Sequence, residues 1–151
     1  MRNDWRKSTP LRARSRGGHE VGWASYQGVR QWVDSTSAAG VPKVTGIVSF
    51  DAHFDLRQPA PDTSSCISFR QVAEHCQQAD QPFKYAYIGI AETNSTRALI
   101  DVATACQVAY TTDLNSTNEA MLPLLWNFLN DVDYLYVTIC LDVLPAAIAP
   151  V

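Results

Sequence analysis

The sequence predicts an α/β domain in which a mainly parallel sheet is covered on both faces by helices. Apolar runs of strand length alternate along the chain with longer stretches of helical periodicity. The runs "KVTGIV" (43–48) and "YLYVTICL" (134–141) are largely apolar in both phases of a strand, which is typical of strands buried on both faces. Together these observations predict a three-layer α/β/α arrangement.

The length, net charge and cysteine pattern of the chain narrow the classes of function that it can have. The chain has 151 residues, enough for one domain with a buried core. Its 12 basic and 15 acidic residues give a net charge of −3, so neither a nucleic acid nor an anionic membrane surface is expected as a partner. No apolar stretch approaches the ~20 residues of a membrane span. The four cysteines lack a C-x-x-C pair and are typical of thiols in a reducing compartment, so a cytoplasmic protein is expected.

The predicted elements follow an atypical start. Residues 1–16 carry half of the 12 lysines and arginines without periodicity, so we expect a disordered or non-native start there and a domain over 17–151. A helical stripe begins near Val21 and ends before Gly40 and Pro42. The remaining pattern predicts strands over 44–50, 84–90, 107–111 and 134–141, and helices over 67–79, 94–105 and 116–130.

Polar side chains follow two of these strands directly. The segment "DAHFD" places Asp51, His53 and Asp55 after the strand over 44–50, and Asp142 follows the strand over 134–141. The carboxyl ends of parallel strands share one sheet edge, where ligands bind, and neighbouring strands lie ~5 Å apart. Aspartate with histidine suits a divalent ion such as manganese better than calcium. The alternative is an incidental polar loop with Asp51 as a helix cap.

His19, in "GGHE" (17–20), offers a further ligand. The preceding glycines let the backbone approach a site closely, although a histidine at a helix start is more often a cap or a surface residue. With His19 there are enough ligands for two ions, and a water shared by two cations becomes a hydroxide nucleophile near neutral pH. The sequence therefore predicts a hydrolytic metal centre.

The motifs "GGHE" (17–20), "DAHFD" (51–55) and "ICLDVLPAAIAP" (139–150) resemble the metal-binding motifs of the ureohydrolases, the arginase and agmatinase superfamily. The segments "GGHEVGWASYQG", "DAHFDLR" and "FRQVAEHC" are similar in sequence to those of the formimidoylglutamase branch, whose members act in histidine degradation. Members of that branch hydrolyse N-formimidoyl-L-glutamate to glutamate and formamide with a pair of manganese ions. The resemblance implies an arginase-like fold, two Mn²⁺ ions and a small-molecule substrate.

The resemblance also implies a role for each matching residue. His19 and Asp55 would bind one ion, His53 and Asp142 would bind the other, and Asp51 would bridge the two. Asp55 would in addition be the catalytic residue that accepts a hydrogen bond from the attacking hydroxide. These roles are expectations carried over from the family motifs.

Two further positions are candidates for substrate binding. Arg57 follows Asp55 by two residues and could bind the substrate carboxylate as a fork, or it could be a surface arginine that only solvates the loop. The segment "TSSC" (63–66) falls where the family places small hydroxyl groups near the substrate, which makes Ser64 and Ser65 candidates unless the segment is only a loop.

The chain departs from the family in two ways. Cys140 stands where the family has the first aspartate of an Asp-x-Asp motif, and a thiolate prefers softer metals than manganese. We expect Cys140 to face the same side as Asp142, because the two share a strand phase. Family members are also roughly twice as long, so only about half of the family sheet is expected, with the strand over 134–141 beside the strand over 44–50.

In that arrangement the strand over 134–141 would expose an apolar edge, which favours self-association into a homo-oligomer. We therefore expect a hydrolase by ancestry whose activity is weak or lost in this chain. One alternative is a related ureohydrolase acting on a guanidino compound such as agmatine. The other is a non-catalytic fragment that binds a partner or associates with itself.

Overall fold

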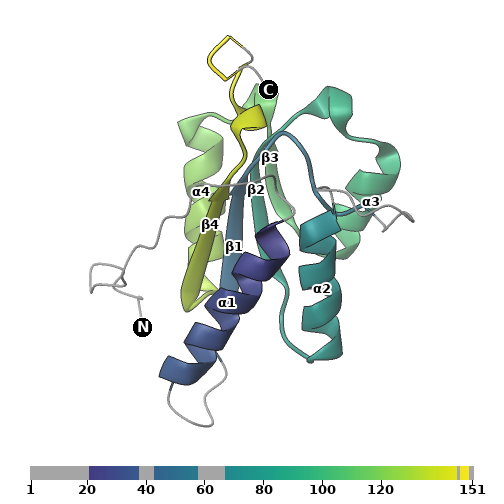
Figure 1. The fold of residues 1–151 in the computed structure, drawn as a ribbon. Helices are drawn as coiled ribbons and strands as arrows, with labels where there is room; N and C mark the ends of the chain where they lie inside the picture. The colour runs from purple at the N-terminus through teal and green to yellow at the C-terminus, as the bar shows by residue number, and fades with distance from the viewer. Residues whose placement is uncertain (1–20, 38–42, 58–66, 146, 150–151) are drawn as a thin grey trace.

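The computed structural model describes residues 21–37, 43–57, 67–145 and 147–149. Within these ranges strands and helices alternate around one sheet (Figure 1). The elements are α1 (Val21–Thr36), β1 (Thr45–Phe50), α2 (Ser68–Gln78), β2 (Lys84–Ile90), η2 (Glu92–Asn94), α3 (Arg97–Ala105), β3 (Ala109–Thr112), η3 (Asp113–Asn115), α4 (Asn118–Asn130), β4 (Tyr134–Ile139) and η4 (Leu141–Val143), where η marks a short 3₁₀ helix. No helix among the described residues is both long enough and apolar enough to cross a bilayer.

The sheet has the strand order β3-β2-β1-β4, and every pair of neighbours is parallel. The predicted pairing of the strand near 134–141 with the strand near 44–50 is confirmed, because Phe50 pairs with Ile139 as well as with Ile88. From β1 the chain moves through β2 to β3 in one direction, and α4 then carries it back to the far side of β1. The direction of winding therefore reverses between β1 and β4, which is where ligands bind in folds of this type.

Helices cover both faces of the sheet, as the sequence predicts. One face packs against α1, α2 and α3, and α4 lies on the other face (Figure 1). The side chains of Ile47 and Tyr85 belong to the first core, whereas those of Val48 and Ala86, one position along each strand, belong to the second. Successive side chains of each strand are thus buried on opposite faces of the sheet. This explains why neighbouring residues of these strands are apolar, rather than every second one.

Two predicted helix starts, at 94 and 116, lie a few residues too early. In the structure α3 and α4 each begin directly after a threonine whose side chain accepts a hydrogen bond from a backbone N–H three residues on. Thr96 accepts from Leu99, and Thr117 accepts from Ala120. Because such a cap satisfies an N–H that the helix leaves unpaired, it fixes the first turn there. The preceding residues form η2 and η3 instead.

The close packing of α4 on β1 depends on a glycine. A Cβ atom added at Gly46 would lie 2.6 Å from Val132 Cγ1 and 3.0 Å from the ring of Phe128. Any side chain at this position would therefore push the end of α4 away from the sheet. The glycine therefore keeps the second core closed near the amino end of β1.

Candidate metal centre

The candidate centre is built from the residues that directly follow β1 and β4. The N–H of Cys140 donates to the carbonyl of Phe50 at 2.8 Å, and the N–H of Asp51 donates to the carbonyl of Ile88 at 3.1 Å. These two bonds extend the hydrogen-bond pattern of the sheet by one residue beyond the ends of β1 and β4. Asp51 and Cys140 are therefore held side by side at the point where the winding of the sheet reverses.

Potential ligand atoms of Asp51, Cys140 and Asp142 all lie within 4.8 Å of one another. His53 joins them, because its Nδ1 atom lies 2.9 Å from Oδ2 of Asp142 and 3.7 Å from Oδ1 of Asp51. Asp51 is only 1% exposed, whereas the other three side chains are partly open to solvent. We call these four residues the β1–β4 cluster. It combines two carboxylates, an imidazole and a thiol.

The loop after β1 is anchored by its apolar residues. Ala52, Phe54 and Leu56 are buried, and the Phe54 ring makes edge contacts with Tyr87 and Tyr110 at centroid distances of 5.3 and 5.1 Å. These contacts fix every second residue of the segment in the core. The alternation of polar and apolar residues in "DAHFD" is therefore that of a loop anchored in the core, not that of a strand with one solvent-exposed face.

Hydrogen bonds orient the members of the cluster. The N–H of His53 donates to Oδ1 of Asp51 at 2.7 Å, and the N–H of Ala52 donates to Oδ1 of Asp142 at 3.3 Å. On the far side of the imidazole, Nδ2 of Asn94 lies 3.4 Å from Nε2 of His53. Asn94 was not among the predicted site residues. Its only signal in the sequence is that it follows β2, whose carboxyl end adjoins that of β1.

The neighbouring groups shift the protonation of the cluster. Burial first, then a hydrogen bond to Asp142 and the nearby charge of Asp51, raise the pKa of the Cys140 thiol to about 12. Burial alone would raise the pKa of Asp142, but hydrogen bonds from Cys140, the amide of Ala52 and the ring of His53 bring it below its ordinary value. The thiol is therefore protonated near neutral pH, and Asp142 is a carboxylate that accepts from it.

The donor set of the β1–β4 cluster fits a divalent cation. Two carboxylates and an imidazole are suitable ligands for ions of intermediate hardness, and the thiol adds a softer donor. The bonds from Cys140 and His53 to Asp142 are made through protons that a cation at the same place would replace. The described residues that could hold the ion are thus Asp51, His53, Cys140 and Asp142.

The other predicted site residues lie elsewhere or outside the described part. Asp55 is buried at a backbone φ of 48°, and its charge is one of the smaller causes, after burial, that raise the pKa of Tyr85. Asp55 is not in the group of three ligands whose atoms lie within 4.8 Å, and its role stays a prediction. Arg57 is exposed. His19 and Ser65 lie outside the described residues, as do the segments 1–16 and "TSSC".

Two solved structures share this fold. Formimidoylglutamase from Bacillus subtilis subsp. subtilis str. 168 matches with a TM-score of 0.69 at 18% identity, over 89% of this chain and 40% of that chain. Helicobacter pylori arginase matches with a TM-score of 0.58 at 17% identity, over 85% of this chain and 49% of that chain. At these identities the likeness establishes an arginase-type α/β fold, of which this chain covers a part.

Curated relatives are closer in sequence. Formimidoylglutamase from Hahella chejuensis (strain KCTC 2396) is 46% identical over 137 residues, which cover 89% of this chain and 41% of that protein. Formimidoylglutamase from Vibrio vulnificus (strain YJ016) is 43% identical over 142 residues, with 89% and 42% covered. The chain thus spans about two fifths of the length of these relatives. The family model described as "Arginase family" matches residues 16–151. The chain therefore belongs to the arginase family.

Proposed function

We propose that this chain carries the metal-binding part of a cytoplasmic, manganese-dependent formimidoylglutamase. The reaction is hydrolysis of N-formimidoyl-L-glutamate to L-glutamate and formamide, a step of histidine degradation. The observation that supports it best is the β1–β4 cluster, which lies at the switch point of the sheet in a chain whose curated relatives are named formimidoylglutamase. The net charge of −3 agrees with a small-molecule substrate rather than a nucleic acid.

The residues of the cluster have distinct parts in the proposed reaction. A divalent ion bound there would lower the pKa of water into the neutral range. Asp51 and Asp142 supply the negative charge that holds the ion, and Asn94 orients the imidazole of His53 from its far side. Water adds to the formimidoyl carbon, the bond to the glutamate nitrogen breaks, and the amine leaves with a proton. We assign the transfer of that proton to the leaving amine to Asp55, which lies, like Asp51, in the segment that follows β1.

The direct test is formamide release from ¹³C-labelled N-formimidoyl-L-glutamate by the Mn²⁺-loaded chain, followed by NMR. We expect slow turnover, because the cluster rests on β4, which has a single strand neighbour among the described residues. The family resemblance implies a second ion, and His19 would be one of its ligands. Formamide release that disappears on removal of the metal supports the proposal. A chain that binds the ion but releases formamide no faster than free Mn²⁺ would contradict the assigned reaction, and preferred hydrolysis of agmatine would favour the guanidino alternative.

Arg57 discriminates between the two substrate classes. Its exposed guanidinium, two residues beyond Asp55, is suited to binding the carboxylates of glutamate. We expect Arg57→Ala to raise the KM for N-formimidoyl-L-glutamate by about tenfold or more, the equivalent of one lost charged hydrogen bond. Cationic agmatine should be unaffected or helped. Arg97→Ala, which removes an exposed arginine of α3, is the matched control. An equal loss with both substrates would rule out carboxylate recognition by Arg57.

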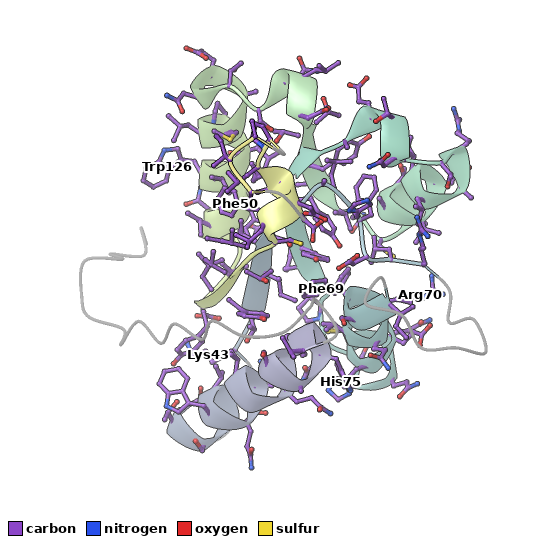
Figure 2. All side chains as sticks on the ribbon, turned by 45° about the horizontal axis from the view of Figure 1, so that its top comes forward. Lys43, Phe50, Phe69, Arg70, His75 and Trp126 are labelled. Carbon is purple, nitrogen blue, oxygen red and sulfur yellow. The ribbon has the colours of Figure 1, made fainter. Side chains whose placement is uncertain are left out.

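A second candidate function, self-association, is favoured by an apolar patch on β4 and α4. Leu135, Val137 and Ile139 pair with residues of β1 that face α4. Although α4 touches β1 near Gly46, its larger contacts are with β2 and β3, and these three side chains of β4 are 37–64% exposed. On α4, Leu122 is exposed as well, and Trp126 points outward from the helix (Figure 2). We call these five residues the β4–α4 patch. On its other side β4 has no strand neighbour within the described ranges, and an apolar patch beside such an edge is a template for pairing with another strand.

We propose that a second copy of the chain covers the β4–α4 patch. Two copies related by a two-fold axis bring the same edge and the same apolar residues together, and a net charge of −3 opposes their approach only weakly. Val137→Lys is expected to shift the chain toward the monomer in sedimentation velocity. Leu114→Lys, at an exposed leucine outside the patch, should leave the distribution unchanged. A monomeric wild type at high concentration would exclude self-association through this patch.

A further inference from the structure

We infer that Cys140 is a direct ligand of the ion in the β1–β4 cluster and that its sulfur makes the centre bind Co²⁺ and Zn²⁺ more tightly than Mn²⁺. This inference rests on the proposed metal site and concerns which ion that site selects. It leaves the proposed hydrolysis reaction as it stands. Manganese would still bind, through the carboxylates and the imidazole, but with lower affinity.

The position of Cys140 differs from that of the other described cysteines. Its backbone is fixed by the hydrogen bond to Phe50, and its sulfur lies within 4.8 Å of ligand oxygens from two buried or half-buried carboxylates. Cys76 instead lies in the apolar core, where its sulfur is 3.3 Å from the hydroxyl of Tyr26. Cys106 packs at the margin of the same core. Only Cys140, among the described cysteines, belongs to a group of potential metal ligands.

The mixed donor set determines the preference. Mn²⁺ is the weakest binder in the first-row series and favours oxygen donors, whereas thiolate sulfur favours softer ions such as Zn²⁺. When the ion binds, the S–H bond of Cys140 breaks, a sulfur–metal bond forms and the proton leaves to solvent. A carboxylate at position 140 would offer oxygen instead, and the advantage of Co²⁺ and Zn²⁺ over Mn²⁺ would shrink. The size of this advantage therefore depends on the side chain at position 140.

The test is a titration of the metal-free chain with Co²⁺ alone, followed by absorption spectroscopy. Thiolate ligation produces a sulfur-to-cobalt charge-transfer band in the near ultraviolet, which is independent of any catalytic activity. We expect this band in the wild type and in Cys76→Ser and Cys106→Ser, and its loss in Cys140→Ser and Cys140→Asp. Competition with Mn²⁺ should show a Co²⁺ preference about tenfold smaller in Cys140→Asp than in the wild type, since substitution of outer-shell partners alone already changes metal affinity by about that factor.

The outcomes separate this inference from the proposed function. Visible cobalt bands without the charge-transfer band would mean that an ion binds but Cys140 does not ligate it, which overturns the inference and leaves the metal site standing. A charge-transfer band that persists in Cys140→Ser would overturn it as well. Absence of any cobalt binding by a folded chain would overturn the metal site itself. An unchanged preference in Cys140→Asp would show that the thiol does not set the selectivity.

Discussion

Asp51→Asn is expected to abolish tight binding of divalent ions while leaving the chain folded. Asp51 is the most buried member of the β1–β4 cluster, and its carboxylate lies near both Asp142 and the imidazole of His53. The amide keeps the shape of the side chain and can still accept the hydrogen bond from the N–H of His53. It removes the negative charge, however, so the affinity should fall by about a hundredfold or more, beyond the effect of outer-shell substitutions.

The measurement is isothermal titration of the metal-free chain with Mn²⁺ and with Co²⁺, with circular dichroism to show that the fold is kept. Asp101→Asn makes the same chemical change at an exposed aspartate that pairs with Arg97 on α3, and its affinity should equal that of the wild type. Equal affinities of Asp51→Asn and the wild type would place any bound ion outside the β1–β4 cluster.

Phe54→Ala should lower the free energy of unfolding by about 3–5 kcal/mol, the usual cost of removing a buried phenylalanine. Phe54 is 1% exposed, and its ring contacts Tyr87 and Tyr110. A domain is stable by only about 5–15 kcal/mol, so this one substitution removes a large share of the total. Because the ring anchors the loop between Asp51 and Asp55, the affinity for divalent ions should fall with the stability.

Urea unfolding followed by fluorescence measures this change. Leu114→Ala serves as the control, because it also replaces a large apolar side chain by alanine but at an exposed site outside the β4–α4 patch, where the expected change is within about 0.5 kcal/mol. A loss below about 1 kcal/mol for Phe54→Ala would show that the ring does not anchor the loop.

The placement of Asp51 and Asp142 at one edge of the sheet could be predicted, because it follows from strand direction, whereas the pairing of their two strands was implied by the family resemblance. Both residues come directly after strands that read as buried, and parallel strands end at the same edge of a sheet. The core was predictable for the same reason, since apolar side chains in both phases require cover on both faces. These features depend on periodicity along the chain, which a sequence displays.

The conformations of the loops could be predicted less well from the sequence. The strand predicted to reach residue 141 ends at Ile139, because η4 begins at Leu141. Cys140 and Asp142 thus come together through a tight turn rather than through strand alternation. Asp55 adopts a left-handed φ of 48°, which is uncommon for residues other than glycine and which the hydrophobic pattern does not indicate. Asn94, at the end of η2, meets His53 across 41 residues of sequence, a tertiary contact that local propensity does not encode.

The measurement that tests the account most directly is anomalous X-ray diffraction from crystals of the chain grown with Co²⁺. A divalent ion held by the β1–β4 cluster should give an anomalous peak between Asp51, His53, Cys140 and Asp142, with the Cys140 sulfur at bonding distance. A crystal in which the imidazole and the thiol still bond directly to Asp142, with the anomalous peak elsewhere on the molecule, would contradict it.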